Sequence, residues 1–363
     1  MKICHITTVH KVNDNRILHK ECKSLHNNGH EIYLICSGAI SCITNGIKII
    51  GIPKFKNRLL QFSLISLKEV FLRGLRINAD VYHFHDPELI FSGVLFRLLG
   101  KKVIYDIHEN YPSSVLSKPY LKNKFIKNFF SFSVDLIEKI SAPLFSKIIT
   151  ARPDISHRFK KYSPVTIKNF PILTNLDIDK SINTKKKKKN VIYVGGLSEI
   201  RGIKILIESF EKIKEAELWL LGPWENQKFR FECQKLRGWE NTKYLGVVEP
   251  DEIYKYLCIS DIGIITFLPY PNHLNTLATK PFEYMQAGLP LIMSNFPYWK
   301  TFFGDLSLYV DPNDSSDIIS KISYLISNPN IMKRMGEDGR KKVLEEYNWE
   351  NESKKLIKTY IEL

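Results

Sequence analysis

The amino-acid sequence predicts an α/β protein with two Rossmann-like domains, each built on a doubly wound parallel sheet. Short apolar strands alternate with helical segments and short turns, which is the pattern of parallel sheets covered by helices on both faces. This alternation starts again after a polar segment at residues 175–189. The length of 363 residues also exceeds that of one ordinary core and suits two domains.

The first series of elements defines a predicted domain at residues 1–168. A helix is expected over Asp14–Asn28, because apolar residues recur there at helical spacing and Gly29 follows as a cap. A second helical segment, Pro87–Leu99, lies between two strands. The strands expected in this domain are residues 2–8, 31–37, 80–85, 102–106 and 147–151.

The second series defines a predicted domain at residues 169–345, and the helical segment 346–363 is expected to pack back on the first domain. Two doubly wound units would face each other across a central cleft. Ligands of such folds bind at the carboxyl ends of the strands, where the polar residues of this sequence fall. The strands expected here are residues 190–194, 217–221, 242–245, 261–265 and 289–294.

Composition and cysteine usage indicate a cytoplasmic protein. No stretch approaches the roughly 18 consecutive apolar residues of a transmembrane helix. The first eight residues, Met1–Thr8, have the pattern of a first strand and not of a signal peptide. The six cysteines show no C-x-x-C spacing, so we expect reduced thiols and neither zinc sites nor disulfides.

The net charge of +15 is concentrated in the first half of the chain. Residues 1–170 hold 26 Lys and Arg against 12 Asp and Glu, a net charge of +14. A basic half favours an anionic partner, such as a membrane surface or a phosphorylated substrate. Nucleic acid is not expected, because aromatic-interleaved RNA motifs and zinc-finger spacings are absent.

One basic segment, Lys118–Ser146, mixes lysines with phenylalanines and has two interpretations. It is either a core-facing helix with a solvated lysine face, or a contact with an anionic bilayer. The second interpretation predicts peripheral association with the inner face of the plasma membrane.

A motif at residues 275–290 indicates a nucleotide site. A loop there opens a short helix that stops at Gly288. A helix N-terminus presents unpaired N–H groups to phosphate, and Lys280 adds a full positive charge. Glu283, one turn further, can accept hydrogen bonds from a pair of sugar hydroxyls. A phosphate seat beside a ribose-binding carboxylate predicts a nucleotide.

A second phosphate element follows the strand at residues 190–194. Gly195 and Gly196 would let the backbone approach a ligand closely, and Arg201 can form bidentate bonds to phosphate. The alternative is a tight turn with no ligand. Neither a G-x-G-x-x-G fingerprint nor a P-loop is present.

Together these motifs resemble the family 4 glycosyltransferases of the GT-B fold, in the bacterial O-antigen and capsule branch. The resemblance implies that Arg201 and Lys280 contact the donor diphosphate and that Glu283 holds the donor ribose. Asn275 stands where the family usually has a glutamate that contacts the donor sugar. Further donor-binding residues implied by the resemblance are Gly196, Thr276, Leu277 and Ala278.

The first half resembles the same branch through three segments: His10–Glu21, Tyr82–Asp86 and Tyr105–Glu109. The resemblance implies that His108 reaches toward the transferred sugar. The alternative is a histidine satisfied by neighbouring backbone groups.

Further residues of these segments are expected near the acceptor or the reacting sugar. Asp14 and Arg16 belong to a polar loop that we expect to face the cleft. His85 and Asp86 either line the acceptor cleft, or Asp86 caps the next helix. Glu109, like Asp106, is a possible carboxylate nucleophile.

The resemblance implies a retaining transfer from a UDP- or GDP-sugar to a polyprenyl-diphosphate-linked oligosaccharide, in lipopolysaccharide or other surface polysaccharide biosynthesis. A donor phosphate oxygen would take the acceptor proton, and the protein would stabilise the leaving diphosphate. No cofactor or metal is expected, although Asp177-Ile-Asp179 mimics a metal motif. The alternatives are a nucleotide-sugar 2-epimerase and a non-catalytic scaffold of the same fold.

Overall fold

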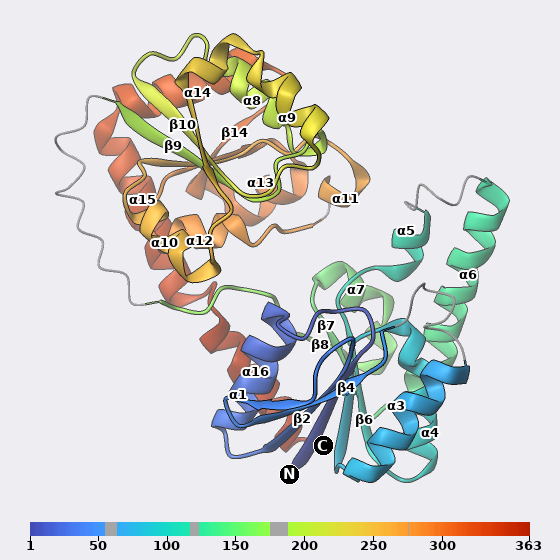
Figure 1. Ribbon diagram of the computed structural model, residues 1–363. Coiled ribbons are helices and arrows are strands. Elements are labelled where there is room, and N and C mark those ends of the chain that lie inside the picture. Colours follow the sequence, from blue (N-terminus) through green and yellow to red (C-terminus); the bar gives the residue numbers. More distant parts are fainter. Residues whose placement is uncertain (55–63, 117–122, 175–187, 275) are drawn as a thin grey trace. The chain divides into compact units, whose positions relative to one another are not determined.

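The computed structural model describes residues 1–54, 64–116, 123–174, 188–274 and 276–363 (Figure 1). The chain divides into two compact units. Unit 1 comprises Met1–Ile172 and Trp349–Leu363, and unit 2 comprises Leu173–Asn348. Each unit holds one sheet with helices on both faces, which confirms the predicted fold class.

The sheet of unit 1 has the strand order β3-β4-β2-β1-β5-β6-β7-β8. Neighbouring strands are parallel except β3, which runs antiparallel to β4. The chain winds outward from β1 to one edge and then returns to build the other side from β5. The strands are β1 (Lys2–Thr7), β2 (Glu31–Ser37), β3 (Cys42–Thr44), β4 (Ile47–Ile52), β5 (Val81–Phe84), β6 (Lys102–Ile107), β7 (Lys147–Thr150) and β8 (Val165–Thr166).

The helix expected at residues 14–28 forms as a π-helical segment, η1, continued by α1. Asp14 caps it, because its carboxylate accepts hydrogen bonds from the backbone N–H groups of Arg16 and Ile17. Gly29, at φ +83°, ends it. The helices of unit 1 are η1 (Asn15–Cys22), α1 (Lys23–Asn27), α3 (Leu64–Ile77), η2 (Pro87–Leu89), α4 (Ile90–Leu98), α5 (Tyr111–Leu116), α6 (Lys124–Ser141), η3 (Ala142–Leu144), α7 (Pro153–Arg158), η4 (Lys160–Tyr162) and α16 (Trp349–Ile361).

The last helix, α16, packs on unit 1 beside η1 and α1. Its Trp349 Nε1 donates a hydrogen bond of 2.9 Å to Ser24 Oγ. Its Tyr360 hydroxyl lies 2.7 Å from His83 Nδ1 on β5. Unit 1 is therefore built from both ends of the chain.

The sheet of unit 2 is entirely parallel, with the order β11-β10-β9-β12-β13-β14. This is the strand order of dinucleotide-binding Rossmann folds, in which the winding direction reverses between the first and fourth strands. Here that reversal lies between β9 and β12. The strands are β9 (Lys189–Val194), β10 (Ala216–Leu221), β11 (Thr242–Gly246), β12 (Ile262–Ile265), β13 (Leu291–Ser294) and β14 (Ser307–Val310).

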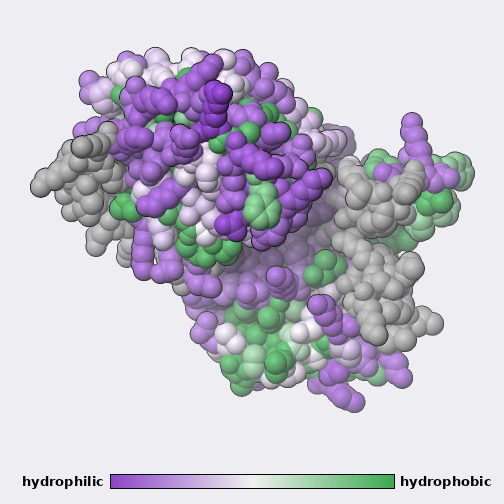
Figure 2. Space-filling model, turned by 45° about the horizontal axis from the view of Figure 1, so that its top comes forward, coloured by the Kyte–Doolittle hydropathy of each residue, from purple (hydrophilic) through white to green (hydrophobic). Residues whose placement is uncertain are grey.

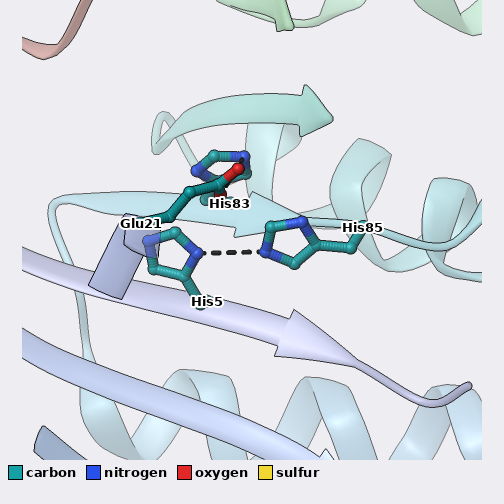
Figure 3. A group of neighbouring side chains, drawn as sticks. All are labelled: His5, Glu21, His83 and His85. Carbon is teal, nitrogen blue, oxygen red and sulfur yellow. Dashed lines mark hydrogen bonds and ion pairs between the residues drawn. The ribbon is translucent and has the colours of Figure 1, made fainter. Parts of the chain in front are cut away.

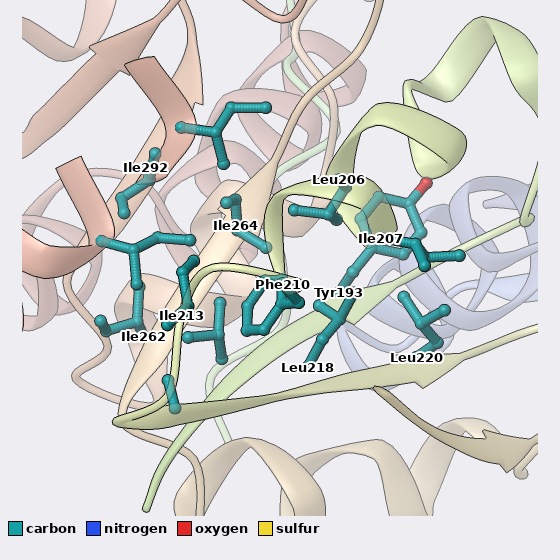
Figure 4. Packing of buried hydrophobic residues seen from close by; sticks show 14 of the residues in the cluster. Tyr193, Leu206, Ile207, Phe210, Ile213, Leu218, Leu220, Ile262, Ile264 and Ile292 are labelled. Carbon is teal, nitrogen blue, oxygen red and sulfur yellow. The ribbon is translucent and has the colours of Figure 1, made fainter. Parts of the chain in front are cut away.

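A dense apolar core holds the helices of unit 2 on this sheet (Figure 4). Tyr193, Leu218 and Ile264 from the strands meet Leu206 and Phe210 from the α8 region, and all are buried. Burying one such side chain fully contributes roughly 1.5–3 kcal/mol. The helices are η6 (Glu199–Arg201), α8 (Ile203–Ser209), α9 (Gln227–Gln234), η7 (Arg237–Asn241), α10 (Pro250–Cys258), α11 (Pro271–Leu274), α12 (Lys280–Gln286), α13 (Pro297–Phe303), η8 (Gly304–Leu306), α14 (Ser315–Ser327) and α15 (Pro329–Glu345).

Helix α6 contradicts the interpretation of its segment as a core-facing helix. The side chains of Phe125, Phe129 and Phe132 are 79, 61 and 64 % exposed. Only two of its residues, Glu138 and Ser141, are buried. The phenylalanines therefore face outward, and contact with an anionic bilayer stays a prediction. Residues 117–122 of this segment lie outside the described residues.

Across the described parts of the chain, every helix is too short or too polar to cross a bilayer.

Candidate active site

A cavity of about 360 Å³ opens in unit 2 where the sheet reverses its winding direction. Four chain segments line it: the loop after β9, the loop after β12, the approach to α12, and helix α13. Open α/β sheets bind their ligands at this position because the loops of neighbouring strands diverge there. The lining residues are Gly195, Arg201, Phe267, His273, Thr276, Ala278, Thr279, Lys280 and Trp299.

Close backbone contacts require glycine in the loop after β9. Gly195 has φ +150°, and a Cβ placed there would lie 2.8 Å from Arg201 Nη1. Gly222, at φ +137°, follows β10, and its Cβ would lie 1.9 Å from the Gly195 carbonyl oxygen. Any side chain at either position would strain the backbone and displace a neighbour. The backbone at Gly195 therefore lies directly against the Arg201 guanidinium.

Arg201 is positioned by the turn that follows it. Gly202 adopts φ +71°, and a Cβ there would lie 2.0 Å from the Thr266 carbonyl oxygen. The turn thus packs against the end of β12. The Arg201 guanidinium lies 5.3 Å from the centre of the Phe267 ring, within the range of cation–π attraction. A planar cation held in this way can bind two oxygens of a phosphate group.

The second cation of the cavity, Lys280, is paired with Glu283. Their charged atoms lie 2.6 Å apart, and the two side chains are 25 and 18 % exposed. The carboxylate offsets part of the charge that Lys280 alone would supply. An anionic ligand would therefore compete with Glu283 for the ammonium group, or draw Lys280 toward itself. Among the described residues, Arg201 and Lys280 are thus the two cationic side chains on the wall of this cavity.

Four of the residues predicted to contact the donor line this cavity: Arg201, Thr276, Ala278 and Lys280. Glu283 joins it through Lys280. Gly196 and Leu277 are half-buried neighbours of lining residues and are not part of the lining themselves. Asn275 lies outside the described residues.

A second polar site lies in unit 1 at the carboxyl ends of β1, β5 and β6. Asp106 Oδ2 is 2.9 Å from His108 Nε2. The Arg16 guanidinium contacts both carboxylate oxygens of Asp106, at 3.1–3.2 Å. His85 Nδ1 is 3.2 Å from His108 Nε2. The structure thus brings together four residues that were expected near the acceptor or the transferred sugar.

Arg16 corrects an expectation, because it does not present its side chain at the surface of the loop. It is 4 % exposed, and its Nη1 donates a 2.8 Å hydrogen bond to the Ile167 carbonyl oxygen. A guanidinium this deep is retained only where anionic groups and acceptors surround it. Its role is therefore to hold Asp106.

Asp86 does not fill its predicted role as a helix cap, and its role at the acceptor cleft stays a prediction. Its side chain does not cap the helix that follows it. The carboxylate Oδ2 instead accepts hydrogen bonds from the Thr7 hydroxyl at 2.8 Å and from the backbone N–H groups of Thr8 and Val9, at 2.6 and 3.2 Å. Asp86 is 1 % exposed and fixes the loop after β1.

That loop also carries His10 and Asp14, which lie 3.4 Å apart. Burial alone would lower the pKa of His10, but the hydrogen bond and charge of Asp14 and the charge of Asp86 raise it above its ordinary value. Although burial would raise the pKa of Asp14, the hydrogen bonds from His10 and the Ile17 N–H lower it. The two groups thus favour each other's charged form.

The two candidate nucleophiles differ in environment. Glu109 is exposed and accepts a 3.0 Å hydrogen bond from the Ser114 hydroxyl. Asp106 is fully buried. Burial would raise the pKa of Asp106, but the charges of Arg16 and His108 hold it well below its usual range. Its oxygens are already engaged by these two partners, which argues against Asp106 as a nucleophile.

Both units match known protein families. Residues 15–168 match the family described as Glycosyltransferase Family 4, and residues 175–342 match the family described as Glycosyl transferases group 1. This chain belongs to these glycosyltransferase families. The predicted resemblance is thereby confirmed for both halves, and unit 2, with its cavity, is the group 1 domain.

Individual relatives are distant. The capsular polysaccharide biosynthesis glycosyltransferase CapM of Staphylococcus aureus is 22% identical over 99% of this chain and 97% of its own length. A glycosyltransferase of Methanocaldococcus jannaschii is 24% identical over 51% of this chain, and O-antigen chain mannosyltransferase B of Escherichia coli is 24% identical over 47%. These last two matches span about half of each relative, 48 and 45%.

Solved structures share the fold of the glycosyltransferase. Sucrose-phosphate synthase from Thermosynechococcus elongatus superposes with a TM-score of 0.78 at 14% identity, covering 99% of this chain and 98% of the other. Anabaena HepE in complex with UDP gives a TM-score of 0.72 at 12% identity, with both chains fully covered. This likeness confirms the GT-B fold class.

A cluster of buried histidines lies beneath the unit 1 site of the glycosyltransferase (Figure 3). His5 on β1 and His83 on β5 are register partners, and His85 follows on the same face. His5 Nδ1 lies 3.0 Å from His85 Nε2. Burial lowers the pKa of all three imidazoles, that of His85 to about 4, so they are neutral near pH 7.

Within the described residues, two groups bring potential metal-ligand atoms within 4.8 Å of one another. They are His5, Glu21, His83 and His85, and His85, Asp106 and His108. The first group fits a metal poorly, because the facing nitrogens of His5 and His85 bond each other and Arg16 Nε lies 2.9 Å from Glu21 Oε1. The Asp177–Asp179 motif lies outside the described residues.

Several site residues were absent from the sequence predictions. Phe267 follows the strand expected at 261–265 by two positions, so the strand-end rule could have found it. Trp299 gave no such signal; it joins the site because its Nε1 donates a 2.8 Å hydrogen bond to the Thr276 carbonyl oxygen. His5 was read only as part of a strand, although its alternation with the apolar positions places it on the His83 face.

Proposed function

We propose that this glycosyltransferase moves a sugar from a nucleoside-diphosphate sugar to a lipid-linked oligosaccharide in bacterial surface polysaccharide biosynthesis, such as that of O-antigen or capsule. The observation that carries the proposal is the unit 2 cavity, with Arg201 and Lys280 on its wall. The capsule and O-antigen functions of the S. aureus and E. coli relatives support the pathway. The complex of HepE with UDP supports a nucleotide donor.

In this proposal the diphosphate of the donor lies between Arg201 and Lys280. The negative charge on the leaving diphosphate grows as the glycosidic bond breaks, so fixed cations stabilise the transition state more than the ground state. Glu283, released from Lys280 by the phosphate, accepts hydrogen bonds from the ribose hydroxyls. The cavity walls formed by Phe267 and Trp299 exclude water from the reacting bond.

We further propose that the transfer retains configuration and needs no metal. A donor phosphate oxygen takes the proton of the acceptor hydroxyl on the face from which the diphosphate departs. The two cations provide the charge stabilisation that a divalent ion provides in other phosphoryl and glycosyl transfers. His108 donates or accepts a hydrogen bond at a hydroxyl of the transferred sugar.

The acceptor side of the proposal uses helix α6. Phe125, Phe129, Phe132, Leu136 and Ile140 recur every three or four residues and form one exposed stripe, with exposed fractions of 43 to 79 %. Green surface at the right edge of Figure 2 belongs to this region. An apolar helical stripe on a basic unit suits insertion at the interface of an anionic bilayer.

The donor half of the proposal is tested by ligand binding. The thermal unfolding midpoint is measured with UDP, GDP, ADP and their sugars; a ligand present at about 100 times its dissociation constant stabilises by roughly 2.7 kcal/mol. Arg201→Ala and Lys280→Ala should each lower the affinity for the stabilising nucleotide by at least about tenfold. Each variant loses a charged hydrogen bond of roughly 1.5–3 kcal/mol. Transfer activity in excess chelator checks metal independence.

A matched control is Arg237→Ala, because Arg237 is a surface arginine of unit 2 whose side chain is 84 % exposed. It should bind nucleotide as the unchanged protein does. Full nucleotide affinity in both Arg201→Ala and Lys280→Ala would exclude the proposed diphosphate site.

A further inference from the structure

Glu21 is a buried acid that the proposed reaction leaves unexplained. It belongs to η1, is fully buried, and points toward the histidine cluster (Figure 3). Its Oε1 lies 2.9 Å from Arg16 Nε, and its Oε2 lies 3.9 Å from His83 Nε2. Neither carboxyl oxygen receives a hydrogen bond of good geometry from the described residues. An isolated buried carboxylate in this position would be strongly destabilising.

The hydrogen bonds around Glu21 cannot all be made by Arg16. The single Nε–H of Arg16 faces Glu21 Oε1 at 2.9 Å, Asp106 Oδ2 at 3.2 Å and His108 Nε2 at 3.2 Å. Its Nη1 is used by the Ile167 carbonyl, and its Nη2 by Asp106. One guanidinium thus faces two buried carboxyl groups, and it does not have enough N–H groups in place to satisfy both.

The Glu21 and Asp106 carboxyls lie against the same Arg16 Nε–H, with Glu21 Oε1 at 2.9 Å and Asp106 Oδ2 at 3.2 Å. Two adjacent acids seldom both ionise, because each charge disfavours the other. Burial, followed by the charge of Asp106, raises the pKa of Glu21 well above its usual range, whereas Arg16 and His108 favour the ionised form of Asp106. The charged and titratable groups that face this pair come from η1 and its cap, β1, β5, β6 and α16, and they include His5, Asp14, Arg16, Cys22, His83, His85, His108 and Tyr360.

We infer that Glu21 is a neutral acid that donates its O–H to Asp106, and that Glu21 and Arg16 together are positioning residues for His108. Asp106, held from two sides, accepts the Nε2–H of His108 at 2.9 Å. The N–H is thereby fixed on Nε2, and Nδ1 keeps its lone pair for a ligand. Arg16, Glu21 and Asp106 form what we call the Asp106 clamp. The catalytic role of the Asp106 clamp rests on the proposed function, in which His108 forms a hydrogen bond with the transferred sugar.

A divalent cation among His5, Glu21, His83 and His85 would also satisfy the Glu21 carboxyl group. The contacts favour a proton, because the Arg16 cation lies against Glu21 and the facing nitrogens of His5 and His85 bond each other. A proton also satisfies an acceptor on Asp106, which a cation in that group would not do. The two explanations differ in metal content and in their response to Glu21→Gln.

Substitutions of Glu21 separate a neutral acid from a carboxylate. Glu21→Ala removes the O–H donor and should lower turnover by about tenfold or more, the ratio that corresponds to one lost hydrogen bond. Glu21→Gln keeps the shape, offers an N–H to Asp106 and cannot ionise, so it should restore turnover to within about threefold of the unchanged protein. A glutamine variant as impaired as the alanine variant would overturn the inference, as would stoichiometric metal in the unchanged protein that Glu21→Gln abolishes.

The Asp106 clamp can also be tested by a measurement that does not depend on transfer activity, the tautomer of His108. In protein labelled with ¹⁵N-histidine, the ring shifts report which nitrogen carries the proton, and His108→Gln identifies the signals of His108. We expect the Nε2–H tautomer in the unchanged protein and in Glu21→Gln, and a mixture in Asp106→Asn, whose amide can donate as well as accept. A mixture in the unchanged protein would overturn the inference. If the tautomers follow expectation but His108→Gln transfers sugar at full rate, the proposed role of His108 fails while the clamp stands.

Discussion

At the scale of single residues, the sequence predicted many of the residues of the two sites but not the contacts between them. The motif containing Arg16 and the motif containing Asp106 and His108 were both recognised, yet their direct contact was not. Residue type and spacing place a group on an element, but the partner 90 residues away depends on the winding of the sheet. The buried ion pair Arg16–Asp106 therefore could not be predicted from the sequence, and the Arg16 side chain was expected to face the cleft.

The histidine cluster predicts an acid-sensitive unit 1. The pKa of His85 is about 4 in the folded protein, against an ordinary value of 6.5, because burial disfavours the imidazolium. Between these values the unfolded chain binds a proton that the folded chain does not, so stability is present above pH 6.5 and is lost as the pH falls toward 4. His5 and His83 act in the same direction. His85 alone would account for about 3 kcal/mol.

Urea unfolding between pH 4 and 7, followed by circular dichroism, measures this loss. His85→Gln should flatten the dependence, whereas His19→Gln, which alters an exposed histidine of the same unit, should leave it unchanged. Glu21 opposes the trend above pH about 4.5, because its pKa is raised, but it is present in all three proteins and cancels in the comparison. Parallel curves for all three proteins would contradict the assignment.

At the scale of elements, the central strands of the sheets could be predicted from the sequence, but the short strands at one edge of the unit 1 sheet could not. The strand expected at residues 31–37 has these bounds in the structure, because its apolar run is buried on both faces. The edge strand β3 and its neighbour β4 were missed, since only β4 carries buried residues and β3 is a three-residue antiparallel partner. Helix α6 shows the converse problem. Its apolar periodicity left a core contact and a bilayer contact open, because periodicity says which residues share a face and not what covers that face.

The exposed stripe of α6 predicts binding to anionic vesicles. Phe129→Ser with Phe132→Ser should weaken binding to phosphatidylglycerol vesicles by about 100-fold, because two aromatic side chains that enter the bilayer interface contribute roughly 1.5 kcal/mol each. Thermal stability should change little, since both residues are more than 60 % exposed. Part of the binding should persist in high salt, which weakens the lysine contribution and not the apolar one.

The matched control is Phe231→Ser, which removes an equally exposed phenylalanine, 61 %, from α9 of unit 2. Flotation of the proteins with vesicles measures the binding. If the double variant floats as well as the control, the stripe is not the membrane contact. If salt releases the unchanged protein completely, the attachment is electrostatic alone.

At the scale of the whole molecule, the chain crosses between its units twice, after β8 and before α16. The sequence predicted two doubly wound sheets because each has its own series of strands and turns. It also placed the unit 2 cavity in outline, since glycines and cations followed strand ends. It could not place Trp299, whose contribution depends on how α13 packs, nor Tyr360, which reaches His83 across 277 positions of sequence.

Because α16 belongs to unit 1, we expect a substitution in its buried face to destabilise unit 1 without destabilising unit 2. Leu356 of α16 is fully buried, so Leu356→Ala should destabilise unit 1 by about 2–5 kcal/mol, a large part of the stability of an ordinary domain. Ile361→Ala, at a position 75 % exposed on the same helix, is the control and should have little effect. Hydrogen–deuterium exchange resolves the two units by peptide. Leu356→Ala should reduce protection in β1 and η1 and leave β9, β12 and the nucleotide-induced shift of unit 2 unchanged. Equal loss of protection in both units would show that they unfold as one, and the division of the chain into two energetically separate units would then be wrong.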